Sequence, residues 1–75
     1  MTMETIDARG HRCPVPTLKL QKALEAASPG GLVRLLADDP MARIDVPHFA
    51  AANGHQVVSA EDQAGAVAFT VRKAS

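Results

Sequence analysis

The sequence has one cysteine, no tryptophan or tyrosine, two phenylalanines and no surplus of either charge. A single cysteine excludes an internal disulfide framework, so stability must come from packed helices and sheet. Eight basic residues balance eight acidic ones. Direct binding of RNA or DNA is therefore not expected, because it favours a basic surplus and aromatic rings. No apolar run approaches the ~18 residues that indicate a membrane span.

The 75 residues suffice for one domain, which we expect to span residues 1–75. Hydrophobic residues make up 47% of the chain, and no low-complexity tract interrupts it. The first four residues lack the basic start and apolar run of a signal peptide. A cytoplasmic, reducing location is therefore expected, and it suits a free thiol.

Periodicity and breaker residues predict the element order βαβαββ. Strands are expected at 5–8, 32–37, 56–60 and 66–72. Helices are expected at 14–27 and from near Met41 or Asp45 to Ala52. This order indicates an α+β fold, a two-layer βαβαββ sandwich with two helices packed on one face of a four-stranded mixed sheet.

The breakers also predict how the elements begin and end. Asp39 is a natural N-cap with Pro40 at the first helical position. Pro47 is easiest to place if Asp45 caps a fresh helix and Pro47 lies in its first turn. The loop of a terminal hairpin is expected at 61–65.

Reactive chemistry is concentrated in Cys13-Pro14-Val15-Pro16. The cysteine falls at or next to the start of the first helix, where free amides and the helix dipole favour an anion. A thiol in such a place has a lowered pKa and a larger thiolate fraction. Because proline has no amide hydrogen, Val15 N–H is expected to be one of the donors that face the sulfur. The alternative is that Cys13 is a small apolar side chain at a buried helix start.

Several neighbours are candidates for stabilising the thiolate or contacting a partner. Between residues 9 and 22 there are four cations and no carboxylate: Arg9, Arg12, Lys19 and Lys22. Leu18 projects from the polar side of the helix and is a candidate docking contact. Asp38 is a further candidate, although a solvated loop carboxylate is the simpler interpretation.

Metal binding and Cys–His catalysis are both disfavoured. His11, His48 and His55 with Cys13 match no usual metal-site spacing, so neither a metal nor another cofactor is expected. A catalytic pair would need a histidine held against the thiol by a third group. His11 lies in a glycine-containing loop, where a solvated ring is the simpler expectation.

Four segments in order resemble the TusA/SirA-like sulfurtransferase family. Residues 7–16 match its D-x-x-G-x-x-C-P-x-P signature. Three further segments match its later motifs: Asp38-Asp39-Pro40, Asp45-Val46-Pro47-His48-Phe49 and Gly54-His55. The resemblance extends from about Thr5 to Arg72.

The resemblance implies a fold like that of the C-terminal domain of translation initiation factor 3. It implies a sulfurtransferase that acts as a stoichiometric relay, in which Cys13 accepts sulfane sulfur as a persulfide. The donor would be a cysteine desulfurase or rhodanese-like protein. The acceptor would be another protein's cysteine, in tRNA thiolation, molybdenum cofactor synthesis or sulfur oxidation. Gly10, Pro14 and Pro16 would be the scaffold, with Asp38 and Asp39 as neighbours.

A second function stays open. The chain is expected to be a monomer, and the family that it resembles includes relatives of uncertain function. The same surface would then serve a redox-sensing or regulatory interaction module. Addition of a sulfur atom to Cys13 by a desulfurase would distinguish the carrier from this module.

Overall fold

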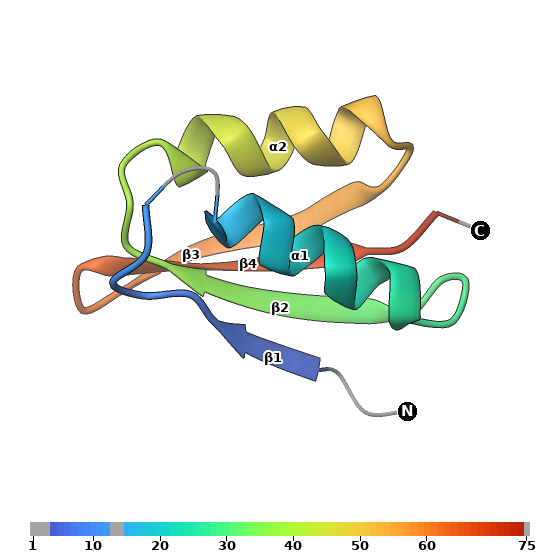
Figure 1. Ribbon diagram of the computed structural model, residues 1–75, viewed down its shortest axis with the longest axis horizontal. Helices are drawn as coiled ribbons and strands as arrows, with labels where there is room; N and C mark the ends of the chain where they lie inside the picture. Colours follow the sequence, from blue (N-terminus) through green and yellow to red (C-terminus); the bar gives the residue numbers. More distant parts are fainter. Residues whose placement is uncertain (1–3, 13–14, 75) are drawn as a thin grey trace.

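The computed structural model describes residues 4–12 and 15–74. Their elements follow the predicted order (Figure 1): β1 (Glu4–Asp7), α1 (Val15–Ala26), β2 (Leu32–Ala37), α2 (Ala42–Ala52), β3 (Gln56–Gln63) and β4 (Ala66–Arg72). Both helices cover the same face of the sheet, so the predicted two-layer sandwich is confirmed. No helix in these two stretches is long and apolar enough to cross a membrane.

The strands of the sheet lie in the order β1-β2-β4-β3. β1 and β2 are parallel, whereas β4 is antiparallel to both β2 and β3. The connection from β1 to β2 runs through α1, so the carboxyl ends of both strands lie at one edge of the sheet. Figure 1 shows that α1 and α2 begin at this same edge. The loops that lead into the two helices therefore meet there.

The core lies between the helices and the sheet. β2 and β4 contribute Val33, Leu35, Ala37, Val67, Phe69 and Val71. Helix α1 contributes Leu20, Ala23 and Leu24 at helical spacing, as the sequence predicted. Each fully buried Val, Leu or Phe side chain among them stabilises the fold by about 1.5–3 kcal/mol relative to exposure. Helix α1, which begins directly after Cys13 and Pro14 in the sequence, is thus held against the sheet by its buried face.

The start of α2 differs from the prediction. Asp39 precedes the helix by three residues, and the N-cap Met41 has no side-chain cap. The Asp39 Oδ1 atom instead accepts the Met41 N–H at 3.2 Å and closes the preceding turn. Pro40 therefore lies outside the helix, and the predicted capping arrangement was wrong.

Pro47 lies inside α2 rather than in the first turn of a fresh helix. The helix has already begun when Asp45 donates its N–H to the Met41 carbonyl at 2.7 Å. A proline at position 47 removes one bond, the one to the carbonyl of Arg43. Burial of Ala42, Val46 and Ala50 against the core compensates for that loss.

The final hairpin is longer than predicted. Glu61, Asp62 and Gln63 continue β3 opposite Ala68, Val67 and Ala66. The turn consists of Ala64 and Gly65 alone, with φ of 49° and 87°. Two successive positive φ values match the strand twist of a tight hairpin. The predicted loop at 61–65 was wrong because an exposed edge strand needs no apolar alternation.

Candidate functional site

The loop after β1 forms a tight turn at the carboxyl edge of the sheet. Ala8 is buried, and its N–H extends the β1–β2 pairing by donating to the Leu36 carbonyl at 2.8 Å. His11 N–H then bonds back to the Ala8 carbonyl at 3.2 Å. Gly10 takes a φ of 85°, in the left-handed region that glycine adopts without strain.

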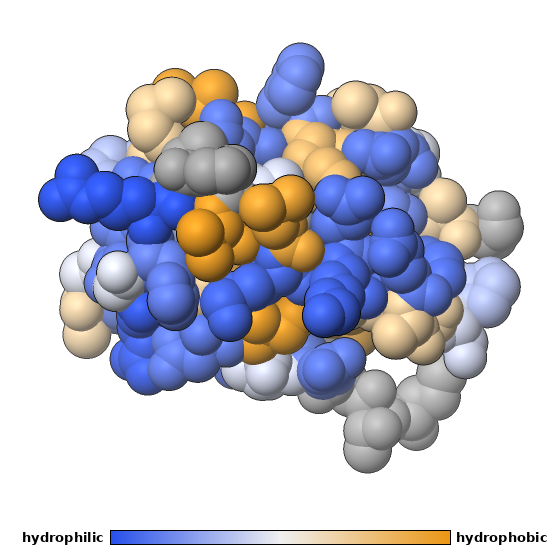
Figure 2. All heavy atoms as spheres, viewed as in Figure 1, coloured by the Kyte–Doolittle hydropathy of each residue, from blue (hydrophilic) through white to orange (hydrophobic). Residues whose placement is uncertain are grey.

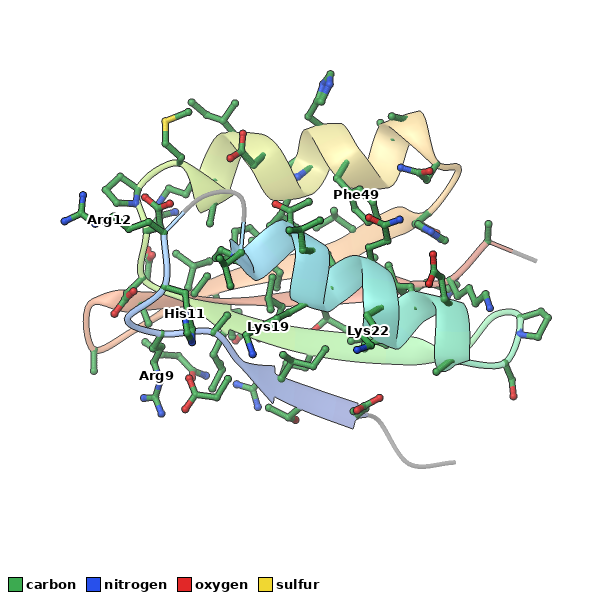
Figure 3. The ribbon with its side chains drawn as sticks, viewed as in Figure 1. Arg9, His11, Arg12, Lys19, Lys22 and Phe49 are labelled. Carbon is green, nitrogen blue, oxygen red and sulfur yellow. The ribbon has the colours of Figure 1, made fainter. Side chains whose placement is uncertain are left out.

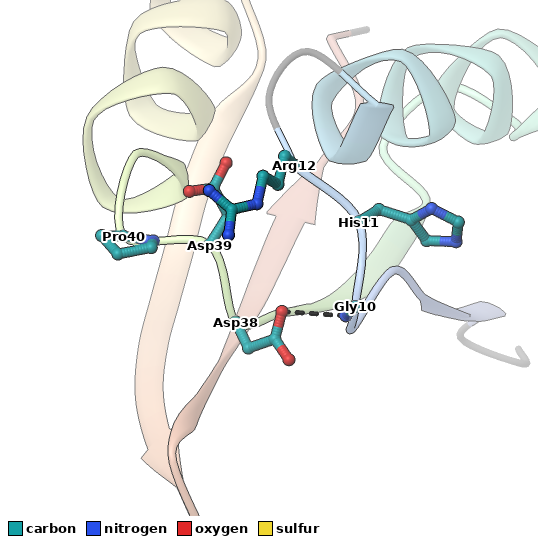
Figure 4. Close-up of a pocket in the computed structure, with 6 residues that line it drawn as sticks. All are labelled: Gly10, His11, Arg12, Asp38, Asp39 and Pro40. Atoms are coloured by element: carbon teal, nitrogen blue, oxygen red, sulfur yellow. Dashed lines mark hydrogen bonds between the residues drawn. The ribbon is translucent and has the colours of Figure 1, made fainter.

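A carboxylate from the end of β2 holds this turn in place (Figure 4). The Oδ1 atom of Asp38 accepts the N–H of Gly10 at 2.9 Å. Asp39, the next residue, accepts the N–H of Met41 in its own loop. Adjacent aspartates thus order the two loops that lead into the two helices. The sequence singled out both residues, but no local pattern indicated the bond across 28 positions.

A hollow of about 310 Å³ lies between these loops. Its lining is Gly10, His11, Arg12, Asp38, Asp39 and Pro40. In Figure 4 the His11 ring points away from Asp38, so these two side chains do not form a pair. The hollow presents both charge signs, from Arg12 on one side and from Asp38 and Asp39 on the other.

Two contacts of described residues fix the beginning of α1: a backbone hydrogen bond between Val15 and Arg12, and the burial of Pro16. Val15 donates its N–H to the Arg12 carbonyl at 2.9 Å. This bond corrects the prediction that Val15 N–H is left to face the sulfur. Pro16, the predicted scaffold residue, is buried in the first turn. The predictions for Cys13 and Pro14 fall outside the described residues.

The predicted cations differ in their surroundings (Figure 3). Arg9 donates to both carboxylate oxygens of Asp7, from Nε and Nη2 at 2.8 Å each. The same hydrogen bonds hold the pKa of Asp7 well below its ordinary value and raise that of Arg9. Arg12, Lys19 and Lys22 are exposed and form no salt bridge with any other described residue. Figure 3 shows both lysines on one flank of α1.

Large apolar side chains are exposed near the starts of both helices. Leu18 is 56% exposed on α1, as predicted from its position on the polar side. Met41 and Ile44 are 46% and 63% exposed at the beginning of α2. Sequence reasoning missed this second pair, although their spacing of three places them on one helix face. Figure 2 shows apolar surface in both regions on the face viewed.

The other histidines are separate from this loop. His55 accepts the Ala74 N–H at Nδ1, at 2.9 Å, and its ring centroid lies 5.9 Å from that of Phe49. His48 is exposed on α2. Over residues 4–12 and 15–74, no group of three or more metal-ligating side chains is present.

The fold and the loop contacts define a small α+β sandwich whose polar contacts converge before the first helix. A model of the family described as sulfurtransferase TusA matches residues 4–73. The chain is 38% identical to the sulfur carrier protein TusA of Pseudomonas fluorescens over 71 residues, 95% of this chain and 86% of that protein. The TusA protein of Pseudomonas aeruginosa is 37% identical over 68 residues, 91% of this chain and 86% of its own.

Solved structures agree. The crystal structure of a SirA-like protein from Desulfitobacterium hafniense matches with a TM-score of 0.84 and 34% identity. The match covers 97% of this chain and all of the other. The chain belongs to the TusA sulfurtransferase family.

Proposed function

We propose that this chain is a sulfur carrier that holds sulfane sulfur as a persulfide on Cys13. In the loading step the Cys13 thiolate attacks the terminal sulfur of a donor persulfide, R–S–SH. A new S–S bond forms, the donor S–S bond breaks, and the donor leaves as R–S⁻. In the delivery step an acceptor thiolate attacks the Cys13 persulfide in the same way. Electrons balance in both steps, so neither needs an oxidant or a cofactor.

The observation that carries the proposal is the family match over residues 4–73, which includes the whole cysteine motif. The single cysteine of the chain supports a carrier rather than a dithiol oxidoreductase, since no resolving thiol is present. Gly10 and Pro16 lie on either side of Cys13 in the sequence, Gly10 in a tight turn and Pro16 buried in the first turn of α1, and in the proposal they act as its scaffold.

Electrostatics supports a reactive thiolate at this position. The positive end of the α1 dipole lies next to residues 13–14. Arg12 adds a charge that no described carboxylate pairs with. Both effects favour the anionic form of a neighbouring thiol and lower its pKa.

The partners follow from the chemistry. We propose a protein donor of the cysteine desulfurase or rhodanese-like class and an acceptor protein with its own cysteine. Each cycle loads and unloads one sulfur, so the chain acts as a stoichiometric sulfurtransferase. We place it in a reducing cytoplasm, where a lone thiol stays free, and expect a monomer.

The test is mass measurement of the intact protein after incubation with a cysteine desulfurase and cysteine. Wild type should gain the mass of one sulfur atom, reversibly on reduction. Cys13→Ser should gain nothing yet melt close to wild type, because an oxygen can still cap a helix. Wild type blocked with iodoacetamide is the matched control. An unchanged wild-type mass would favour the redox-sensing or regulatory module, and sulfur gain by Cys13→Ser would exclude a single-thiol mechanism.

A further inference from the structure

We infer that Asp38 is a positioning residue for the Cys13 thiol, acting through the backbone of Gly10. The inference rests on the proposed carrier function. It assigns to Asp38 a geometric duty rather than contact with a partner or with the sulfur.

The hydrogen bond from Gly10 to Asp38 connects the turn after β1 to the end of the buried strand β2. Asp38 directly follows Ala37, a buried residue of the central strand β2. Gly10 lies three residues before Cys13 and has a backbone that few other residues would adopt. The 2.9 Å bond between them therefore anchors Gly10, a residue with a flexible backbone, to the end of a central strand of the sheet.

The other contacts of the turn hold Gly10 less firmly than its hydrogen bond to Asp38 does. His11 N–H reaches the Ala8 carbonyl at 3.2 Å, which is long for such a bond. The Asp7–Arg9 pair braces the strand side of the turn but does not touch Gly10. A Cβ at Gly10 would meet no heavy atom within 4 Å, so the space on the side-chain side of this residue is open. Among the described residues, Asp38 is the one acceptor to which the Gly10 N–H donates.

The charge of Asp38 acts in the opposite direction to its geometry. The pKa of Arg9 is raised chiefly by its hydrogen bond to Asp7, and the Asp38 charge contributes to the rise. The carboxylate therefore acts electrostatically on this loop, where a negative charge disfavours a thiolate. If Asp38 served the thiol through charge, its removal would only increase reactivity. If Asp38 instead acts by positioning, the effect of its substitution on thiol reactivity depends on whether the new side chain keeps an acceptor oxygen.

Two variants separate these effects. Asp38→Asn keeps the Oδ1 acceptor and removes the charge, whereas Asp38→Ala removes both. Glu25→Gln, at the far end of α1, is the matched control for loss of one negative charge. Three measurements are made on each protein: hydrogen exchange of the Gly10 amide by NMR, the pH midpoint of Cys13 alkylation by iodoacetamide, and the rate of sulfur loading by a desulfurase.

We expect Gly10 exchange to rise about tenfold in Asp38→Ala and to stay within about threefold of wild type in Asp38→Asn. The alkylation midpoint should fall by a few tenths of a pH unit in Asp38→Asn, with a smaller change in Glu25→Gln. Loading should slow severalfold in Asp38→Ala relative to Asp38→Asn. Equal Gly10 exchange and equal loading in these two variants would overturn the inference. Failure of wild type to load would refute the carrier function instead, and the exchange comparison would still decide whether Asp38 holds the turn.

Discussion

The guanidinium of Arg9 binds both carboxylate oxygens of Asp7, two residues earlier, with two contacts of 2.8 Å. The pair places opposite charges side by side, so Arg9 contributes little net potential to the cysteine loop. Arg12, Lys19 and Lys22 form no such pair with any described residue. The four cations of the N-terminal half are therefore not equivalent.

Thiol reactivity should reflect that difference. We expect the pKa of Cys13 to lie below the ~8.5 of free cysteine. Arg12→Gln should raise it more than the double substitution Asp7→Asn with Arg9→Gln, which removes a neutral pair. The pH dependence of iodoacetamide alkylation measures the pKa of Cys13 in wild type and in both variants. A wild-type midpoint at or above the free value would contradict activation by the helix start.

The Asp7–Arg9 pair itself predicts an acid titration. The hydrogen bonds from Arg9 hold the pKa of Asp7 well below its ordinary value. A carboxyl group with a depressed folded pKa stabilises the fold above its unfolded value and loses that contribution as pH falls through the folded one. NMR of the Asp7 carboxyl should therefore show it ionised below pH ~3.9, the usual midpoint for aspartate. Arg9→Gln should restore the ordinary value, and added salt should raise the pKa because both groups are exposed. An ordinary value in wild type would show that the pair does not persist in solution.

Lys73 predicts a stability effect at the opposite end of α1. Its Nζ atom donates to the Ala27 carbonyl at 2.7 Å and to the Glu25 carbonyl at 3.3 Å. A cation at a helix C-terminus satisfies free carbonyls and opposes the dipole. Lys73→Met keeps the stem but should lower stability by about 1 kcal/mol, with a Tm drop of roughly 4–8 °C. Thermal melting by circular dichroism measures it. Arg72→Met, an exposed neighbour, is the control, and an equal effect of both substitutions would show that the two carbonyl contacts are not responsible.

The elements that the sequence predicted well carry strong local signals. Leu32–Ala37 was predicted to the residue because an apolar run between Gly31 and Asp38 admits few alternatives. Leu20 and Leu24 fixed the buried face of α1 through helical spacing. In both cases burial and local pattern agree.

The features that escaped prediction depend on context outside the local pattern. Pro47 is tolerated in mid-helix because buried neighbours on the same helix hold it against the sheet. Ala64 adopts a positive φ that its own preferences disfavour, because the strand pairing on either side requires it. The Asp38–Gly10 bond joins residues 28 positions apart and becomes visible only when β1 and β2 are paired. The candidate site was located from the motif, whereas its internal contacts required the fold.

Partner docking gives the last prediction. A persulfide must approach another protein's cysteine within bonding distance, so the surface around Cys13 must lie within the interface. Lys19 and Lys22 are exposed on one flank of α1 and form no salt bridge with a described residue. Their charge attracts an acidic partner over a distance and mainly accelerates encounter. Lys19→Glu with Lys22→Glu should therefore slow sulfur transfer through the association rate.

Stability should hardly change, because both lysines are exposed. Added salt should narrow the difference between variant and wild type by slowing the wild type more, since screening weakens attraction and repulsion alike. Stopped-flow transfer at two salt concentrations measures this. Leu18→Ser, on the same helix, is the matched control, since loss of an apolar contact should affect dissociation with little salt dependence. Equal transfer rates for the double variant and wild type at low salt would refute electrostatic docking through α1. They would direct attention to Met41 and Ile44 at the start of α2, a second exposed apolar surface.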